Sequence, residues 1–99
     1  MEIIKTRRNG TLILALDGKM DITTAPDLEQ VVKNELDGVT ELIMDFEKLA
    51  YISSAGLRVL LLAQKKMTKQ GGSMKVIHVS ETVMEVMTAM GFVGILTIE

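Results

Sequence analysis

Cysteine is absent from this chain of 99 residues, which excludes a disulfide scaffold, a thiolate metal site and a thiol nucleophile. A basic excess is also absent: 13 acidic residues stand against 11 basic ones, and the net charge is −2. Direct nucleic-acid binding is therefore not expected. No purely hydrophobic run exceeds five residues, as in Val59–Ala63, whereas a helix needs about 20 to span a bilayer. No secretory signal is visible, and the lack of cysteine is compatible with a reducing cytoplasm.

The chain has ordinary globular composition, with 47% hydrophobic and 24% charged residues. A chain of this length forms one core and has no room for a second. We therefore predict that residues 1–99 form a single domain. The mean hydropathy of +0.29 indicates apolar residues in a core or an interface.

The first strands are predicted to form a hairpin. Residues 3–8 and 11–17 flank Asn9-Gly10, a pair that suits a type I′ turn. Residues 12–16 are apolar without alternation, which is typical of a central strand covered on both faces. Two further strands are predicted at 42–46 and 74–79, which includes His78. Residues 47–53 are expected to form a loop, and residues 95–98 are a candidate final strand.

Three helices are predicted between and after these strands. Thr24 with Asp27 resembles a capping box at the start of the first helix. The second helix begins at Ser53 or Ser54 and runs to about residue 70. The third follows Ser80, with three methionines predicted to face the core: Met84, Met87 and Met90. The order ββαβαβα predicts a mixed α/β sheet, an antiparallel hairpin joined to parallel strands, with the helices packed against it.

Two loops follow the second and third predicted strands, at 17–21 and 45–57, and they are the candidate places for function. Both segments lie at the carboxyl ends of parallel strands, so we expect them to lie side by side. Ser53 and Ser54 stand there at a predicted helix start. The ordinary role of such serines is N-capping. The functional alternative is a phosphate acceptor, because the helix dipole and its free amides favour an added anion.

Enzymatic activity is not expected. The chain lacks a G-x-S-x-G elbow, a Walker A motif and a G-x-G-x-x-G motif, and its sole histidine is His78. The acidic residues of the two loops lack the spacing of metal ligands: Asp17, Asp21, Asp45 and Glu47. Catalytic residues, metals and cofactors are therefore all predicted to be absent.

Residues 42–57 closely resemble STAS domains, and within them the bacterial anti-sigma factor antagonists. In that family a strand is followed by an Asp-Ser-Ser/Thr-Gly-Leu turn into a helix, and the residue after the Asp is phosphorylated. That residue maps to Ser54, and the glycine and leucine map to Gly56 and Leu57. The family's Asp is Ser53 here, which makes Ser53 the alternative acceptor.

A second loop carries the same resemblance. Residues 18–21, Gly-Lys-Met-Asp, resemble the family's Gly-x-Leu-Asp loop, whose acid lies near the phosphorylated residue. The resemblance therefore implies a STAS fold with five partner-binding residues: Asp21, Ser53, Ser54, Gly56 and Leu57. It further implies that Asp21 and Asp45 supply an acidic background against which an added phosphate is repelled.

The resemblance also implies a function for a cytoplasmic protein. An antagonist of this family binds an anti-sigma factor, usually one with an ATP-binding serine kinase domain, and so releases a sigma factor for transcription. Phosphorylation of the serine breaks that complex. The alternative is a STAS module that docks to another partner, such as a lipid-transport ABC system or a stress-signalling complex.

Overall fold

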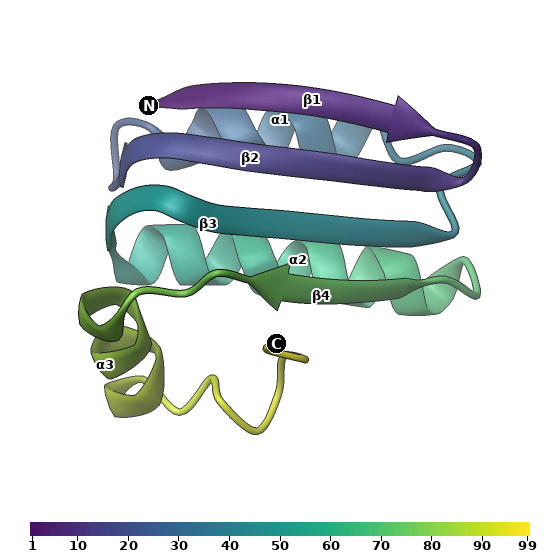
Figure 1. The fold of residues 1–99 in the computed structure, drawn as a ribbon. Coiled ribbons are helices and arrows are strands. Elements are labelled where there is room, and N and C mark those ends of the chain that lie inside the picture. Colours follow the sequence, from purple (N-terminus) through teal and green to yellow (C-terminus); the bar gives the residue numbers. More distant parts are fainter.

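The structure is a computed structural model that describes residues 1–99. The elements run in the order β1 (Glu2–Arg8), β2 (Thr11–Met20), α1 (Ala25–Asn34), β3 (Glu41–Ile52), α2 (Ser54–Lys69), β4 (Ser73–Ile77) and α3 (Glu81–Ala89). One four-stranded sheet has the order β1-β2-β3-β4, antiparallel between β1 and β2 and parallel thereafter (Figure 1). The predicted mixed α/β fold is confirmed.

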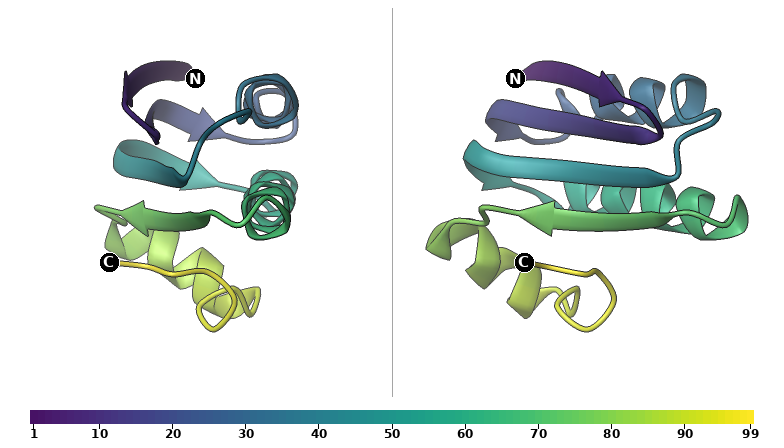
Figure 2. Two further views of the ribbon diagram at one scale, coloured as in Figure 1. Left: turned by 90° about the vertical axis from the view of Figure 1, so that its right-hand side faces the viewer. Right: turned by 45° about the vertical axis from the view of Figure 1, so that its right-hand side comes forward.

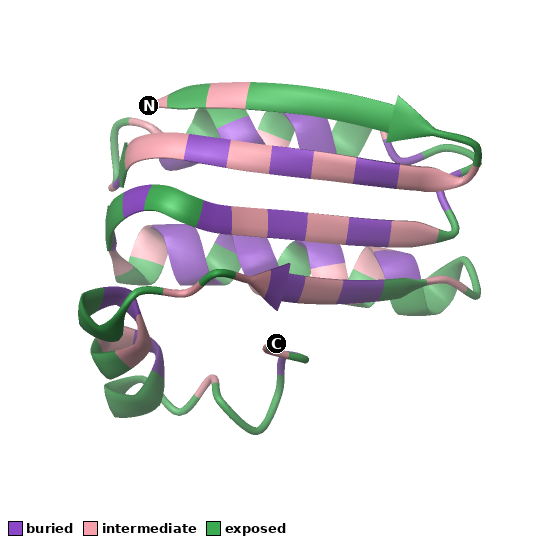
Figure 3. Cartoon of the chain, in the orientation of Figure 1, coloured by how far each residue is buried: buried purple, intermediate pink, exposed green.

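Both long crossover helices lie on one face of the sheet, and no helix covers the other face (Figure 2). The buried side chains of β2 and β3 alternate toward α1 and α2, whereas Ile13 and Ala15 on the opposite face are only half-buried (Figure 3). The expectation that the second strand is covered on both faces is therefore wrong.

The third strand is longer than predicted. Residues 47–52, expected to be a loop, continue β3 to Ile52. The register against β2 shifts twice. Ala15 pairs with Asp45 but Asp17 pairs with Lys48, which is the first shift. Gly18 pairs with Leu49 but Lys19 pairs with Tyr51, which is the second. Each shift inserts one extra residue into β3, and such bulges change the alternation of a strand. In residues 47–52 two exposed residues precede each buried one, so the sequence there lacks the alternation of polar and apolar residues by which a strand is predicted.

Residues 78–99, which include α3, lie at the β4 edge of the sheet (Figure 1). Helix α3 begins after its predicted cap, since Ser80 Oγ accepts a hydrogen bond from the Val83 amide at 3.2 Å. Met87 is buried as expected, but Met84 is only half-buried and Met90 is 50% exposed. The candidate final strand is a single parallel bridge between Val76 and Ile98.

Two local predictions at the β1–β2 and β2–α1 connections are wrong in detail. Only Asn9 of the hairpin turn has a positive φ, of 55°, whereas a type I′ turn requires positive φ at Gly10 as well. Thr24 is the N-cap of α1, but its side chain makes no capping hydrogen bond.

None of the three helices combines the length and the apolar composition that crossing a membrane requires.

Candidate functional site

The carboxyl ends of β2 and β3 meet at one edge of the sheet, as the sequence predicts. The amide of Ser53, directly after β3, donates to the Met20 carbonyl at the end of β2 over 2.9 Å. This hydrogen bond places residues 21–24 next to residues 53–57. The two loops that carry the family resemblance therefore form one continuous surface at the start of α2.

Ser53 is occupied by a structural role. It is the N-cap of α2, with extended backbone, and its Oγ accepts a hydrogen bond from the Gly56 amide at 3.4 Å. Its carbonyl accepts from the Leu57 amide at 3.0 Å. Ser53 is half-buried. Its hydroxyl therefore satisfies an amide that the helix leaves without an internal partner.

Ser54 is the first residue of α2, and its hydroxyl is free. The side chain is exposed and makes no hydrogen bond. It lines a shallow surface hollow together with Ile22, Ala55 and Arg58. Ile22 is 77% exposed, which is a large apolar exposure for a residue beside a polar helix start. Of the two adjacent serines, Ser54 is the more exposed and the one whose hydroxyl makes no hydrogen bond.

Gly56 and Leu57 lie beneath this surface. Both are buried, and Leu57 is fully inaccessible. A Cβ on Gly56 would lie 2.8 Å from Met20 Cγ and 2.9 Å from Ile52 Cγ1, so only glycine lets α2 approach the strand ends this closely. The Leu57 side chain packs in the core and anchors the helix, so it presents no surface of its own to a partner. The assignment of Leu57 to the partner-binding residues stays a prediction.

Asp21 turns its carboxylate into its own loop. Oδ1 accepts hydrogen bonds from the Thr23 hydroxyl at 2.7 Å, the Thr23 amide at 2.9 Å and the Thr24 amide at 3.1 Å. The bond from the Thr23 hydroxyl is the largest cause that lowers the pKa of Asp21. Asp21 thus closes the turn that precedes α1, and Ile22 in that turn lies exposed beside Ser54.

Asp45 does not belong to this site. It lies on the open sheet face, seven residues before the end of β3, a separation of about 20 Å along a strand. The predicted acidic background at Ser54 therefore does not include Asp45. Its partner is His78, which lies just after β4 rather than on it, with a φ of 58° and 56% of its side chain exposed.

The His78–Asp45 pair is a feature that sequence reasoning missed. His78 Nδ1 lies 2.9 Å from Asp45 Oδ1 and 4.0 Å from Glu47 Oε2. The hydrogen bond to Asp45 is the largest cause that raises the pKa of His78. Ligand atoms of these three residues lie within 4.8 Å of one another, so this is the group that could hold a metal ion. The residues lie 33 positions apart in the sequence, and only the sheet brings them together.

The comparisons with known proteins identify the family of this fold. The family model of the STAS domain matches residues 2–99. A Bordetella bronchiseptica protein provisionally named anti-sigma factor antagonist BtrV is 33% identical over 96 residues, which cover 96% of this chain and 83% of that protein.

Solved structures agree in fold. A Thermotoga maritima protein provisionally described as an anti-sigma factor antagonist has a TM-score of 0.89 at 19% identity, covering 97% of this chain and 84% of that one. The anti-sigma factor antagonist SpoIIAA in its unphosphorylated form has a TM-score of 0.78 at 18% identity, covering 99% and 87%. At such identities these likenesses show the fold alone.

Substitution of the two serines separates their roles. Ser53→Ala removes the side-chain cap and is expected to lower the free energy of unfolding by about 0.5–2 kcal/mol. Ser54→Ala removes a hydroxyl that bonds to nothing and is expected to change it by less than about 0.5 kcal/mol. Urea unfolding of both variants measures the difference. Equal losses, or a larger loss for Ser54→Ala, would contradict this assignment of the cap.

The pKa of His78 gives a pH-dependent prediction. Because the folded chain raises this pKa above 6.5, the contribution of the pair to stability is complete below the unfolded value and disappears as the pH rises through the folded value. Asp45→Asn is expected to lower the pKa of His78 and to destabilise the chain more at about pH 5.5 than at about pH 8.5. Proton NMR follows the single imidazole directly. The control is Asp27→Asn on α1, and an unchanged titration in Asp45→Asn would refute the pairing.

Proposed function

This chain belongs to the STAS domain family, and on that premise we propose that it is an anti-sigma factor antagonist whose binding is switched off by phosphorylation of Ser54. The observation that carries the proposal is that the two adjacent serine hydroxyls differ in hydrogen bonding. Ser53 caps α2 through the Gly56 amide, while Ser54 is exposed with no hydrogen-bond partner. A kinase can reach the second hydroxyl without first breaking a contact of the fold.

The partner in this proposal is an anti-sigma factor with an ATP-binding serine kinase domain. The name of the Bordetella relative, which aligns with 96% of this chain, supports an anti-sigma factor as the target. ATP and magnesium belong to the partner, and the role of this chain is regulatory. The exposed Ile22 beside Ser54 supplies an apolar contact at the centre of the proposed interface.

Phosphorylation acts on binding rather than on folding. A phosphate at Ser54 adds close to two negative charges at the N-terminus of α2, where the helix dipole favours them and the first turn contains no acidic residue. The domain is therefore expected to remain folded. In a complex the same charges must lose their hydration and face the partner's surface, which can cost several kcal/mol where like charges meet.

The test is a binding titration with a candidate anti-sigma factor kinase from the same genome. Ser54→Ala is expected to bind as the unmodified chain does and to stay bound when ATP is added. Ser54→Asp is expected to bind at least about tenfold more weakly. A charge repulsion of about 1.4 kcal/mol in the complex is enough to produce that change in the dissociation constant. Ser53→Ala is the matched control and is expected to remain sensitive to ATP.

Mass-spectrometric mapping after kinase treatment decides the acceptor. Phosphate on Ser54 in the unmodified chain, together with release of the partner, supports the proposal. Phosphate on Ser53 alone would refute the assignment of the acceptor. Tight binding with no modification of either serine would refute the switch and leave a constitutive docking module.

A further inference from the structure

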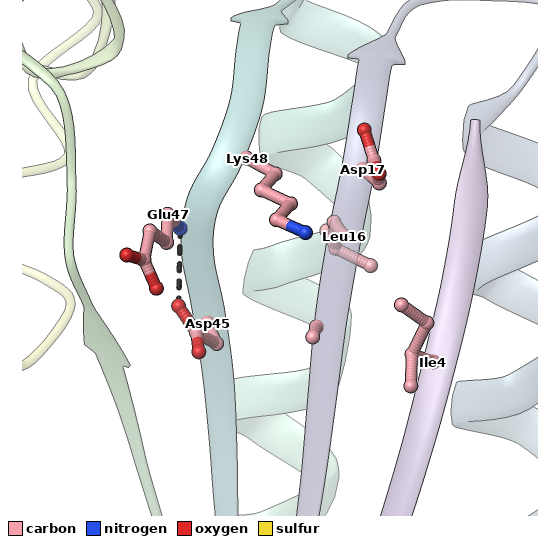
Figure 4. A pocket seen from close by; sticks show the side chains of 7 residues that line it. Ile4, Leu16, Asp17, Asp45, Glu47 and Lys48 are labelled. Carbon is pink, nitrogen blue, oxygen red and sulfur yellow. Dashed lines mark hydrogen bonds between the residues drawn. The ribbon is translucent and has the colours of Figure 1, made fainter.

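The open face of the sheet carries a hollow of about 100 Å³ that shares no lining residue with the hollow beside Ser54. Figure 4 shows the side chains that line it. Its floor is apolar and comes from β1 and β2, through Ile4, Ala15 and Leu16. Ile4 is 45% exposed. A wholly polar ligand would make no apolar contact with this floor. The hollow therefore suits an occupant that has an apolar portion.

The β3 bulge creates the hollow. Ala15 pairs with Asp45, but Asp17 pairs with Lys48, so β3 has one more residue than β2 over this stretch. The extra residue turns Glu47 and Lys48 outward in succession. The Glu47 amide donates to Asp45 Oδ1 at 3.0 Å and fixes that carboxylate at the rim (Figure 4). The small side chain of Ala15 leaves the space beneath them open.

The rim is acidic. Three carboxylates border the hollow, Asp17 from β2 and Asp45 and Glu47 from β3, against the single ammonium of Lys48. Lys48 forms no ion pair with any of them. His78, beside the hollow, lies 2.9 Å from Asp45 Oδ1 and 4.0 Å from Glu47 Oε2. Even with His78 protonated, the charges of these groups sum to −1. The position therefore attracts a cationic occupant.

We propose that this hollow receives an arginine side chain of a partner protein docked on the open sheet face. The aliphatic stem of an arginine covers the floor of Ile4 and Ala15, as such stems do on apolar surfaces. The guanidinium has five donors in a planar fork, which suits carboxylates on two strands. Asp17 on β2 lies diagonally opposite Asp45 on β3, because Asp45 pairs with Ala15 and Asp17 pairs with Lys48. A volume of about 100 Å³ accommodates one side chain rather than a helix.

This surface is independent of the proposed switch. Ser54 is the first residue of α2, on the helix-covered side of the sheet, whereas the hollow lies on the face that no helix covers (Figure 2). A partner held by the hollow can stay bound whether or not Ser54 is phosphorylated. Binding at the hollow is therefore independent of the proposed switch at Ser54.

The test is an NMR titration of the ¹⁵N-labelled chain with the peptide acetyl-Gly-Arg-Gly-amide. Amide shifts are expected at Ala15, Asp17, Asp45 and Glu47, with a dissociation constant of order millimolar. The same peptide with citrulline in place of arginine keeps the shape, loses the charge, and is expected to bind at least about fivefold more weakly. Shifts of equal size with citrulline, or none with arginine at about 20 mM, would overturn the proposal.

Variants locate the binding. Asp45→Asn combined with Glu47→Gln is expected to abolish the localised shifts, while Glu81→Gln combined with Glu85→Gln on α3 is expected to leave them unchanged. The unbound spectrum of each variant reports whether it is folded. Loss of binding in both pairs would indicate general attraction to an acidic protein and would refute a specific hollow.

Two other occupants are distinguished in the same spectra. Zn²⁺ that shifts the same amides at micromolar concentration and excludes the peptide would assign the position to a metal ion. Shifts that grow with protein concentration alone and include Arg8, at the other end of this sheet face, would assign it to a second copy of the chain. Either result would overturn the proposal of an arginine from a separate partner.

Discussion

The hydrogen bond from the Ser53 amide to the Met20 carbonyl, 2.9 Å long, is the constraint on which the rest of the site depends. It ties the ends of two parallel strands together after β3 has absorbed two extra residues. Gly56 then lets α2 start directly against Met20 and Ile52, with no room for a Cβ. A strand end, a loop and a helix start are thereby fixed as one rigid surface.

That rigidity gives the two serines different chemistry although they are neighbours. The strand end holds Ser53 extended, so its hydroxyl reaches back to the helix amide. Ser54 is the first helical residue and points outward, beside Ile22 on a loop that the Asp21 carboxylate holds in place. A charge added at Ser54 changes what the surface can bind while the contacts beneath it remain made.

Most of the fold and the place of the site could be predicted from the sequence, because helix starts and hairpins have local signals. The boundaries of α2, the hairpin and the adjacency of the two loops were all predictable. Three features were not, because they depend on tertiary contacts. Bulges replaced the alternation of β3 with a period of three. The Thr24 hydroxyl donates to the Lys19 carbonyl instead of capping α1. Asp45, the partner of His78, lies 33 residues earlier in the sequence, before α2 and β4.

The central claim is that the fold presents Ser54 so that a phosphate alters the surface and leaves the domain intact. Amide hydrogen exchange of the chain before and after phosphorylation of Ser54 tests this directly. The account predicts unchanged protection across β2, β3 and the buried turns of α2, with differences confined to residues 21–25 and 53–58. Loss of protection across the sheet would show that phosphorylation unfolds the domain, and it would contradict the account.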